Sequence, residues 1–269
     1  MVAKKGYSRM IETYVISIPN ETKRYNFIKS QLALYPFFNS HFIDPIIGKD
    51  LSLKFLETYY DKEKAINDLG RELTLNEIGC ALSHRKAWEQ ILQQPNCDYG
   101  LILEDDALIS GNFARIQQEL NSFLDKRDDP FLLLLTPTEY IANKNYFKHE
   151  YLNIYRFFNG WYTTGYIINK KAINILLNIF PKVFYPADDW NIYKKYIHIY
   201  SCAPYLISIS VSEVISSTIN NNAKSFNSKN KDQRLNNFII FSYFVSILKK
   251  IFTKIYKTAR RIKATKLIF

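Results

Sequence analysis

Three consecutive carboxylates, Glu104, Asp105 and Asp106, follow the apolar run 101–103 in this 269-residue chain. The run is typical of a short buried strand in a parallel sheet. Alternate side chains of an extended backbone share a face, so we expect Glu104 and Asp106 to point together and Asp105 to point the other way. Two hard oxygen ligands on one face can hold Mg²⁺ or Mn²⁺ with a diphosphate, whereas a solvated acidic turn is the alternative.

A second acidic pair, Asp188 and Asp189, lies between Pro186 and Trp190. A proline-stiffened loop would present a carboxylate beside an apolar surface, which raises its pKa and makes it a useful general base. Aspartate is also a favoured helix N-cap, and residues 192–197 can form a helix. The pair therefore predicts either a base or a helix cap, and the pattern favours neither.

Glycines bracket the aromatic segment 160–166, which includes Trp161 and Tyr162. Such a loop can lie against a flat ligand, for example a sugar ring, and ordinary aromatic packing is an equal alternative. The segment leads into Ile167-Ile168-Asn169 and a predicted helix over 170–179.

A longer helix is predicted to start at Thr74, because Thr74 and Glu77 have the spacing of a capping box, and to end near residue 93. Arg85 lies in the middle of its apolar stripe and His84 on the flank. A cation on such a stripe either extends to water or meets a buried anion, so Arg85 is a weak candidate for a diphosphate contact. A lone helix histidine is more often structural than a ligand.

The elements that must position these residues follow an alternating order. A strand is expected at 13–18, an amphipathic helix at 21–34 and a second strand at 42–47. This order suggests one nucleotide-binding half of an α/β fold. Further elements are predicted as a helix over 112–124 and strands over 131–135 and 151–158, with 51–73 weakly helical and peripheral.

The net charge of +11 is unevenly distributed. The chain is 47% hydrophobic and 16% aromatic, which argues against disorder. No acidic residue follows Asp232, while nine cations do, so residues 1–233 carry a net charge of only +2. A nucleic-acid-binding protein more often spreads its cations over the folded face, so no nucleic-acid partner is expected.

The cationic tail has a pattern of its own. Residues 216–237 are rich in Ser, Asn and Lys and predict a linker or mobile loop after a first domain at 1–215. In residues 238–269 apolar side chains fall on one helical face and cations on the other, which is typical of a basic amphipathic helix on an anionic membrane. A helix packed on the domain or a nucleic-acid tail is the alternative.

Cysteine usage and the N-terminus favour the cytoplasm. Cys80, Cys97 and Cys202 are an odd, scattered set without metal-type spacing, which fits free thiols in a reducing compartment. No stretch reaches the length of a signal peptide's apolar region or of a transmembrane helix. We therefore expect a cytoplasmic protein that is peripheral on the inner membrane.

Five motifs in order resemble glycosyltransferase family 25, which includes the bacterial lipooligosaccharide galactosyltransferases. They cover most of the chain: Val15-Ile16-Ser17-Ile18 with Arg24; Glu77, Cys80, Ser83-His84 and Trp88; Leu103-Glu104-Asp105-Asp106; Thr163-Thr164-Gly165-Tyr166-Ile167-Ile168 with Lys171-Ala172; and Pro186-Ala187-Asp188. The basic C-terminal tail is also similar.

The resemblance implies a Rossmann-like GT-A fold, a UDP-sugar donor, inversion at the anomeric carbon and a Mn²⁺ or Mg²⁺ cofactor. It implies a β-1,4-galactosyltransferase acting on a lipid-linked oligosaccharide, with Asp106 and Glu104 as metal ligands. The base would be Asp188, with Asp189 second. The donor-binding residues would be Ser17, Ile18, Arg24, His84, Arg85, Glu104 and Asp105. The acceptor-binding residues would be Trp161, Tyr162, Thr163 and Trp190.

This sequence departs from the family at two places, both on the expected acceptor side. Tyr162 replaces a glycine before the threonine, and Asp189-Trp190 replaces apolar residues. Two other classes stay open. A metal-dependent phosphoesterase could use Glu104, Asp106, Asp188 and Asp189, although no histidine has a metal-pair spacing; a non-catalytic membrane or nucleic-acid-binding protein could act through its tail.

Overall fold

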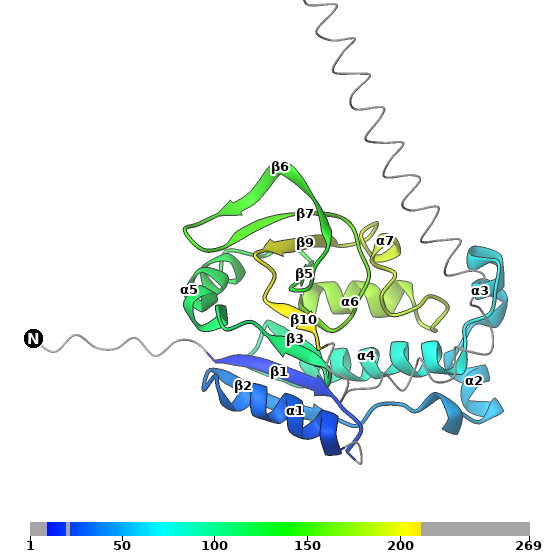
Figure 1. Ribbon diagram of the computed structural model, residues 1–269. Helices are drawn as coiled ribbons and strands as arrows, with labels where there is room; N and C mark the ends of the chain where they lie inside the picture. The colour runs from blue at the N-terminus through cyan, green and yellow to red at the C-terminus, as the bar shows by residue number, and fades with distance from the viewer. Residues whose placement is uncertain (1–9, 20–21, 211–269) are drawn as a thin grey trace, which may run out of the picture. The chain divides into compact units, whose positions relative to one another are not determined.

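The computed structural model describes residues 10–19 and 22–210 (Figure 1). Its centre is an eight-stranded sheet in the order β2-β1-β3-β8-β5-β9-β7-β6. The strands are β1 (Ile11–Ile16), β2 (Phe38–Ile43), β3 (Tyr99–Glu104), β5 (Phe131–Leu134), β6 (Glu139–Lys148), β7 (Asn153–Asn159), β8 (Gly165–Asn169) and β9 (His198–Ala203). The α/β class predicted from the sequence is confirmed.

The first half of the sheet is parallel and the rest is mixed. β1 pairs in parallel with β2 on one side and with β3 on the other, whereas β8 runs antiparallel to both β3 and β5. The central strands are buried on both faces, which explains why β3, β5 and β8 read as continuous apolar runs. β2 and β3 therefore flank β1 on its two edges within the sheet.

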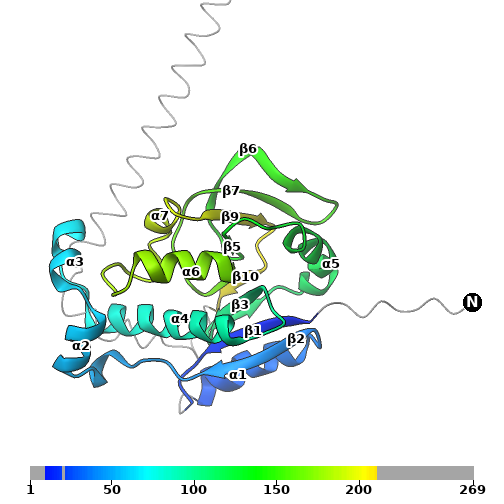
Figure 2. The same ribbon diagram turned by 180° about the vertical axis from the view of Figure 1, so that it is seen from behind.

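Two pairs of helices cover the two faces of the sheet (Figures 1 and 2). On one face α1 (Thr22–Ala33) and α5 (Phe113–Leu124) contribute Ile28 and Leu120 to a core with Val15 and Leu103. On the other face α4 (Leu75–Gln93) and α6 (Lys170–Ile179) pack against Tyr14, Ile102 and Ile168. Each face thus has its own apolar core.

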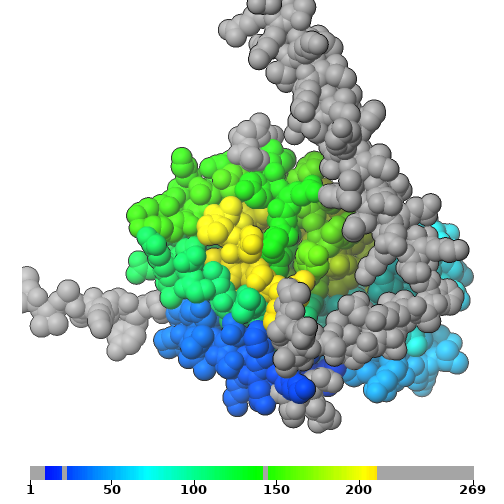
Figure 3. All heavy atoms as spheres, viewed as in Figure 1, coloured from blue at the N-terminus to red at the C-terminus, as the bar shows by residue number. Residues whose placement is uncertain are grey.

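Smaller elements lie around this centre. They are η1 (Gly48–Asp50), α2 (Leu53–Tyr59), α3 (Lys62–Leu69), α7 (Trp190–Tyr193) and a two-stranded sheet of β4 (Ala107–Ile109) and β10 (Ile207–Ile209). In the space-filling view the yellow residues at the end of the described chain reach the surface between its blue and green parts (Figure 3). The small sheet therefore joins the end of the domain to the segment after β3.

The predicted start of the long helix is confirmed, whereas the predicted bounds of the second strand, at the edge of the sheet, are wrong. The capping box is present at the start of α4, where the Thr74 side chain accepts from the Glu77 backbone N–H and the Glu77 carboxylate accepts from Thr74. The second strand lies at Phe38–Ile43 and not at 42–47. The Ile46 N–H donates to Ser83 Oγ at 2.8 Å, so this apolar segment packs against α4 instead of extending the sheet.

The linker and tail predicted at 216–237 and 238–269, with the boundary after 215, lie outside the described residues. Within residues 10–19 and 22–210, no helix is both long and apolar enough to span a membrane. Cys80, Cys97 and Cys202 are all described, and none forms a disulfide.

We predict that Gly79→Ala destabilises the fold. Alanine at a helix interior usually stabilises by about 0.5–1 kcal/mol relative to glycine. Here the added Cβ would lie 2.5 Å from Ile46 O and 2.9 Å from Gly48 N, both backbone atoms that must shift. Overpacking of this kind should lower the free energy of unfolding by about 1–3 kcal/mol in urea denaturation.

Gly111→Ala is the matched control, because its Cβ would meet nothing within 4 Å. Its free energy of unfolding should stay within about 0.5 kcal/mol of the wild type. A Gly79→Ala protein as stable as this control would contradict the close packing of α4 on η1.

Candidate active site

The topology of the sheet brings the acidic motif to a position where α/β proteins bind ligands. β1 and β3 are parallel neighbours with Ile16 opposite Glu104, so their carboxyl ends lie side by side. After β1 the chain forms β2 on one side of β1 and then β3 on the other side. Ligands of open α/β sheets bind at the point where the strand order reverses in this way. Because β8 is antiparallel to β3, with Leu103 opposite Gly165, the loop before β8 ends at the same place.

The Glu104 carboxylate is held by two neighbours. His84 Nε2 lies 3.2 Å from Glu104 Oε1, and the Thr163 hydroxyl donates to the same oxygen. Burial raises the pKa of the Glu104 carboxyl, but the hydrogen bond from His84, followed by that of Thr163 and the charge of Arg24, outweighs burial. The pKa of Glu104 therefore lies below its ordinary value, and a buried carboxylate stays ionised at the end of β3.

A chain of hydrogen bonds fixes His84 from behind. Trp88 Nε1 donates to the Tyr166 hydroxyl at 2.9 Å, and the same hydroxyl lies 2.9 Å from His84 Nδ1. Indole nitrogen is a donor only, so the Tyr166 oxygen accepts from Trp88 and its single proton is left to donate to Nδ1. A neutral His84 then carries its proton on Nε2 and donates it to Glu104.

Asp105 and Asp106 share one partner. Arg24 Nη2 lies 2.8 Å from Asp105 Oδ1 and 2.7 Å from Asp106 Oδ2. The prediction that Asp105 points away from Asp106 is therefore wrong. The strand ends at Glu104, and the next two residues form a turn in which strict alternation no longer applies.

The donor-side residues predicted before α1 do gather around this pair. Burial raises the pKa of the Asp105 carboxyl, and Arg24, the Ser17 hydroxyl and the Ile18 backbone N–H oppose the shift. β1 ends at Ile16, earlier than predicted, which leaves Ser17 and Ile18 free to turn toward the acidic motif. Ser17, Ile18 and Arg24, which follow β1 in sequence, thus lie around the acidic motif.

Asp106 has the donor chemistry that a divalent cation requires. Its Oδ1 atom is buried and, among the described residues, has no hydrogen-bond partner. Burial and the Glu104 charge raise the pKa of Asp106 to about 6, against the attraction of Arg24. An unpartnered, buried carboxylate oxygen beside a second carboxylate fits a hard cation such as Mn²⁺ or Mg²⁺.

The two acids of the second motif have different surroundings. Burial raises the pKa of the half-buried Asp188, its own N–H and that of Tyr162 lower it, and the Glu104 charge raises it. Asp189 is the N-cap residue of α7, and the positive charges of Lys195 and Lys194 act on its carboxylate. The Glu104 charge thus acts on Asp188, whereas Asp189 occupies the N-cap position of a helix at Trp190–Tyr193 and not at the predicted 192–197, with no side-chain hydrogen bond to the helix.

The aromatic loop divides into exposed and buried members. Trp161 and Tyr162 are 52% and 49% exposed, consistent with a surface that a ligand can reach. Trp190 is fully buried, and its Nε1 donates to Tyr162 O at 3.1 Å. Thr163 is also buried and donates to Glu104, so of the four predicted acceptor-binding residues Trp161 and Tyr162 have exposed side chains, and the acceptor role of all four stays a prediction.

Tyr162 has a φ angle of 79°. This value lies in the left-handed region, which glycine adopts readily and which is strained for a tyrosine. This is the position at which the sequence departs from the family glycine. The conformation is held from both sides, since Asp188 accepts from the Tyr162 N–H and Trp190 donates to its C=O.

Arg85 makes a contact that the sequence did not indicate. Its Nη2 donates to Pro181 O at 3.1 Å, and burial lowers the pKa of its guanidinium. It lines a narrow pocket of about 20 Å³ with His84, Phe180 and Tyr193, and within the described chain no carboxylate pairs with it. Its predicted diphosphate contact stays a prediction.

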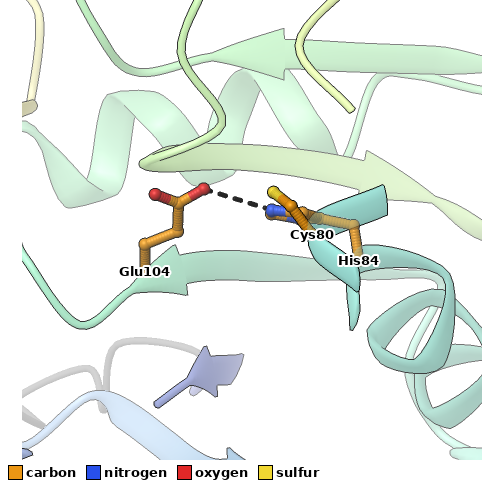
Figure 4. A group of neighbouring side chains, drawn as sticks. All are labelled: Cys80, His84 and Glu104. Atoms are coloured by element: carbon orange, nitrogen blue, oxygen red, sulfur yellow. Dashed lines mark hydrogen bonds and ion pairs between the residues drawn. The ribbon is translucent and has the colours of Figure 1, made fainter. Parts of the chain in front are cut away.

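Cys80 was missed as a site residue. It precedes His84 by one helical turn on α4, and its Sγ, a nitrogen of His84 and an oxygen of Glu104 all lie within 4.8 Å of one another (Figure 4). The signal in the sequence was the i, i+4 spacing of Cys80 and His84, which places both on one helical face.

These features define an α/β domain of nucleotide-binding topology with a carboxylate-lined site at its switch point. The family model described as Glycosyltransferase family 25 (LPS biosynthesis protein) matches residues 10–191. The chain therefore belongs to glycosyltransferase family 25, as the motifs predicted. Family membership carries the GT-A assignment with it.

Curated relatives match over about half of the chain. Procollagen galactosyltransferase 1-A of Xenopus laevis is 28% identical over 167 residues, which are 55% of this chain and 25% of the relative. Procollagen galactosyltransferase 2 of Homo sapiens is 26% identical over 151 residues, 53% and 22% of the two chains. The chain thus spans about a quarter of the length of these relatives.

Solved structures resemble the chain more distantly. The galactosyltransferase LgtC in complex with donor and acceptor sugar analogues has a TM-score of 0.35 and 12% identity, over 70% of this chain and 72% of that one. The inositol-1-phosphate CTP transferase from T. maritima has a TM-score of 0.37 and 12% identity, over 78% and 93%. Likenesses at this level carry no functional argument.

We predict that Asp106→Asn stabilises the metal-free protein at high pH. The pKa rises from 3.8 to about 6 on folding, so the protonated form favours the folded state and this contribution is lost as the pH rises through 6. The asparagine protein should gain about 1–3 kcal/mol in free energy of unfolding near pH 7.5, and much less near pH 4.5, in urea titrations with chelator.

The exposed Asp44 provides the control, since Asp44→Asn should change stability equally at both pH values. A gain for Asp106→Asn that is the same at both pH values would contradict a raised pKa for Asp106.

Proposed function

We propose that the protein is an inverting glycosyltransferase that moves galactose from a UDP-sugar to a sugar hydroxyl of a lipooligosaccharide or lipopolysaccharide. One observation carries the proposal: Asp188 accepts from the Tyr162 N–H and Glu104 from the hydroxyl of the next residue, Thr163, so one loop links two acids that lie more than eighty residues apart in sequence. The family description supports the lipopolysaccharide acceptor, and the names of the curated relatives support galactose.

The donor end of the site must balance negative charge. The departing nucleotide diphosphate gains charge as the glycosidic bond breaks, and catalysis requires opposite charge placed in advance. Arg24 orients Asp105 and Asp106 from one side, and Ser17 and Ile18 flank them. When bound at Asp106, with Glu104 as the further ligand, a divalent cation would supply Lewis-acid neutralisation of the diphosphate.

The acceptor end must remove one proton. Inversion is a single displacement, so one carboxylate on the face opposite the leaving group is sufficient. Asp188 accepts the proton of the acceptor hydroxyl as that oxygen attacks the anomeric carbon, and its raised pKa suits a base. The exposed rings of Trp161 and Tyr162 lie on the same loop and offer stacking surfaces for a sugar.

A metal-dependent phosphoesterase fits the site less well. Such sites recruit several histidines, and all four histidines are described. His84 alone reaches the acidic motif, whereas His41, His149 and His198 pair with Glu12, Glu119 and Arg156.

A donor screen tests the proposed reaction. The full chain is incubated with UDP-galactose, UDP-glucose and UDP-N-acetylglucosamine, with Mn²⁺ or chelator and with or without a sugar acceptor, and UDP release is measured. We expect release that requires UDP-galactose, acceptor and metal together. Phosphate release from a simple ester without sugar transfer, or full turnover in chelator, would contradict the proposal.

Asp188→Asn should separate binding from chemistry. Loss of the base should lower kcat by about 10²–10⁴-fold while UDP affinity, measured calorimetrically, stays within about threefold. Asp189→Asn is the matched control, and it should retain most activity because Asp189 faces Lys194 and Lys195. The reverse outcome would assign the base to Asp189.

The cytoplasmic, membrane-peripheral location is also a proposal, and it rests on the amphipathic pattern of residues 238–269. A chain truncated after residue 237 should move from vesicles containing anionic lipid to the supernatant in a sedimentation assay, while its activity on a soluble acceptor is kept. Undiminished pelleting of the truncated chain would contradict a membrane-binding tail. Vesicle binding that is lost on truncation, with no transfer activity in either chain, would favour the non-catalytic binding alternative.

A further inference from the structure

A thiol, an imidazole and a carboxylate converge beside the acidic motif. Cys80 and His84 lie one turn apart on α4, and Glu104 reaches them from the end of β3 (Figure 4). One potential ligand atom from each lies within 4.8 Å of the other two. Two ligands on one helical face and a third on a strand give a group held by two rigid elements.

The donor set discriminates between metals. Mg²⁺ and Mn²⁺ prefer sites of oxygen ligands alone, whereas a thiolate and an imidazole select borderline ions such as Zn²⁺ and Co²⁺. Three protein ligands with one position left open is the usual arrangement of a non-structural zinc site.

His84 also has the supporting partner that a metal-bound histidine requires. Its Nδ1 is hydrogen-bonded to the Tyr166 hydroxyl at 2.9 Å, and Trp88 holds that hydroxyl in turn. Such partners orient the imidazole and leave Nε2 toward the ion. Nε2 is the nitrogen that faces Glu104.

We propose that Cys80, His84 and Glu104 form a binding site for a zinc-class divalent ion, which shares Glu104 with the proposed hard-cation site at Asp106 and differs from it in its thiolate and imidazole ligands. On binding, the Cys80 thiol releases its proton to solvent, and His84 changes to the tautomer that carries its proton on Nδ1. Nδ1–H then donates to the Tyr166 oxygen, and the Tyr166 hydroxyl rotates so that its own proton points away from His84. Glu104 then exchanges its bond to His84 for a bond to the ion.

Co²⁺ is the spectroscopic probe for this site. The metal-stripped full chain is titrated with Co²⁺, and we expect a near-ultraviolet thiolate-to-cobalt charge-transfer band that saturates at one equivalent and is removed by Zn²⁺. Cys80→Ser should lose the band, and the matched control Cys97→Ser should keep it. Glu104→Gln should weaken the apparent Co²⁺ affinity by about 10-fold or more.

A second measurement uses the wild-type chain, in case a variant does not fold. Zn²⁺ should protect Cys80 from alkylation in peptide mass spectrometry, with the similarly half-buried Cys97 as the internal reference. Absence of a band, a band that persists in Cys80→Ser, or equal protection of the two thiols would overturn the proposal. None of these readouts depends on glycosyl transfer, so they stand or fall apart from the proposed function.

Discussion

A single, largely shielded negative charge at the end of β3, the Glu104 carboxylate with its side chain 25% exposed, organises the site. Taking a carboxylate out of water costs several kcal/mol unless partners replace its hydration, and Glu104 has partners from two directions. His84 comes from α4 and Thr163 from the loop before β8. Because His84 is itself positioned by Tyr166, the ionised state of Glu104 depends on residues of the apolar core beneath it.

The sheet topology explains why residues distant in sequence meet at this charge. The parallel pair β1 and β3 places Ser17 and Ile18 beside the acidic motif, and the antiparallel strand β8 delivers Thr163 to the same end. An all-parallel arrangement would start β8 at the opposite edge of the sheet. The antiparallel direction of β8 therefore brings the proposed donor and acceptor sides together in one site.

Local signals made part of this structure predictable. The capping box located the start of α4, the unbroken apolar runs located β3 and β5, and the motif order identified the family. These features are set by residues within a few positions of one another, and they need no knowledge of tertiary contacts.

Other features depend on contacts that a linear pattern does not contain. Asp105 and Asp106 point together because Arg24, some eighty residues earlier, attracts both, and Trp190 is buried because α7 folds under the aromatic loop. Cys80 was overlooked because its partner on β3 is twenty-four residues away in sequence. The edge strand β2 was misplaced because Ile46 bonds to α4 and not to the sheet.

The backbone of Tyr162 has one more consequence. An L-residue in the left-handed region costs about 1–2 kcal/mol, which the contacts to Asp188 and Trp190 must offset. In return, the backbone that carries the half-exposed phenol ring is fixed before any ligand arrives. A sugar docking there would lose little of its affinity to the ordering of this loop backbone, which favours partners whose shape fits the loop as it stands.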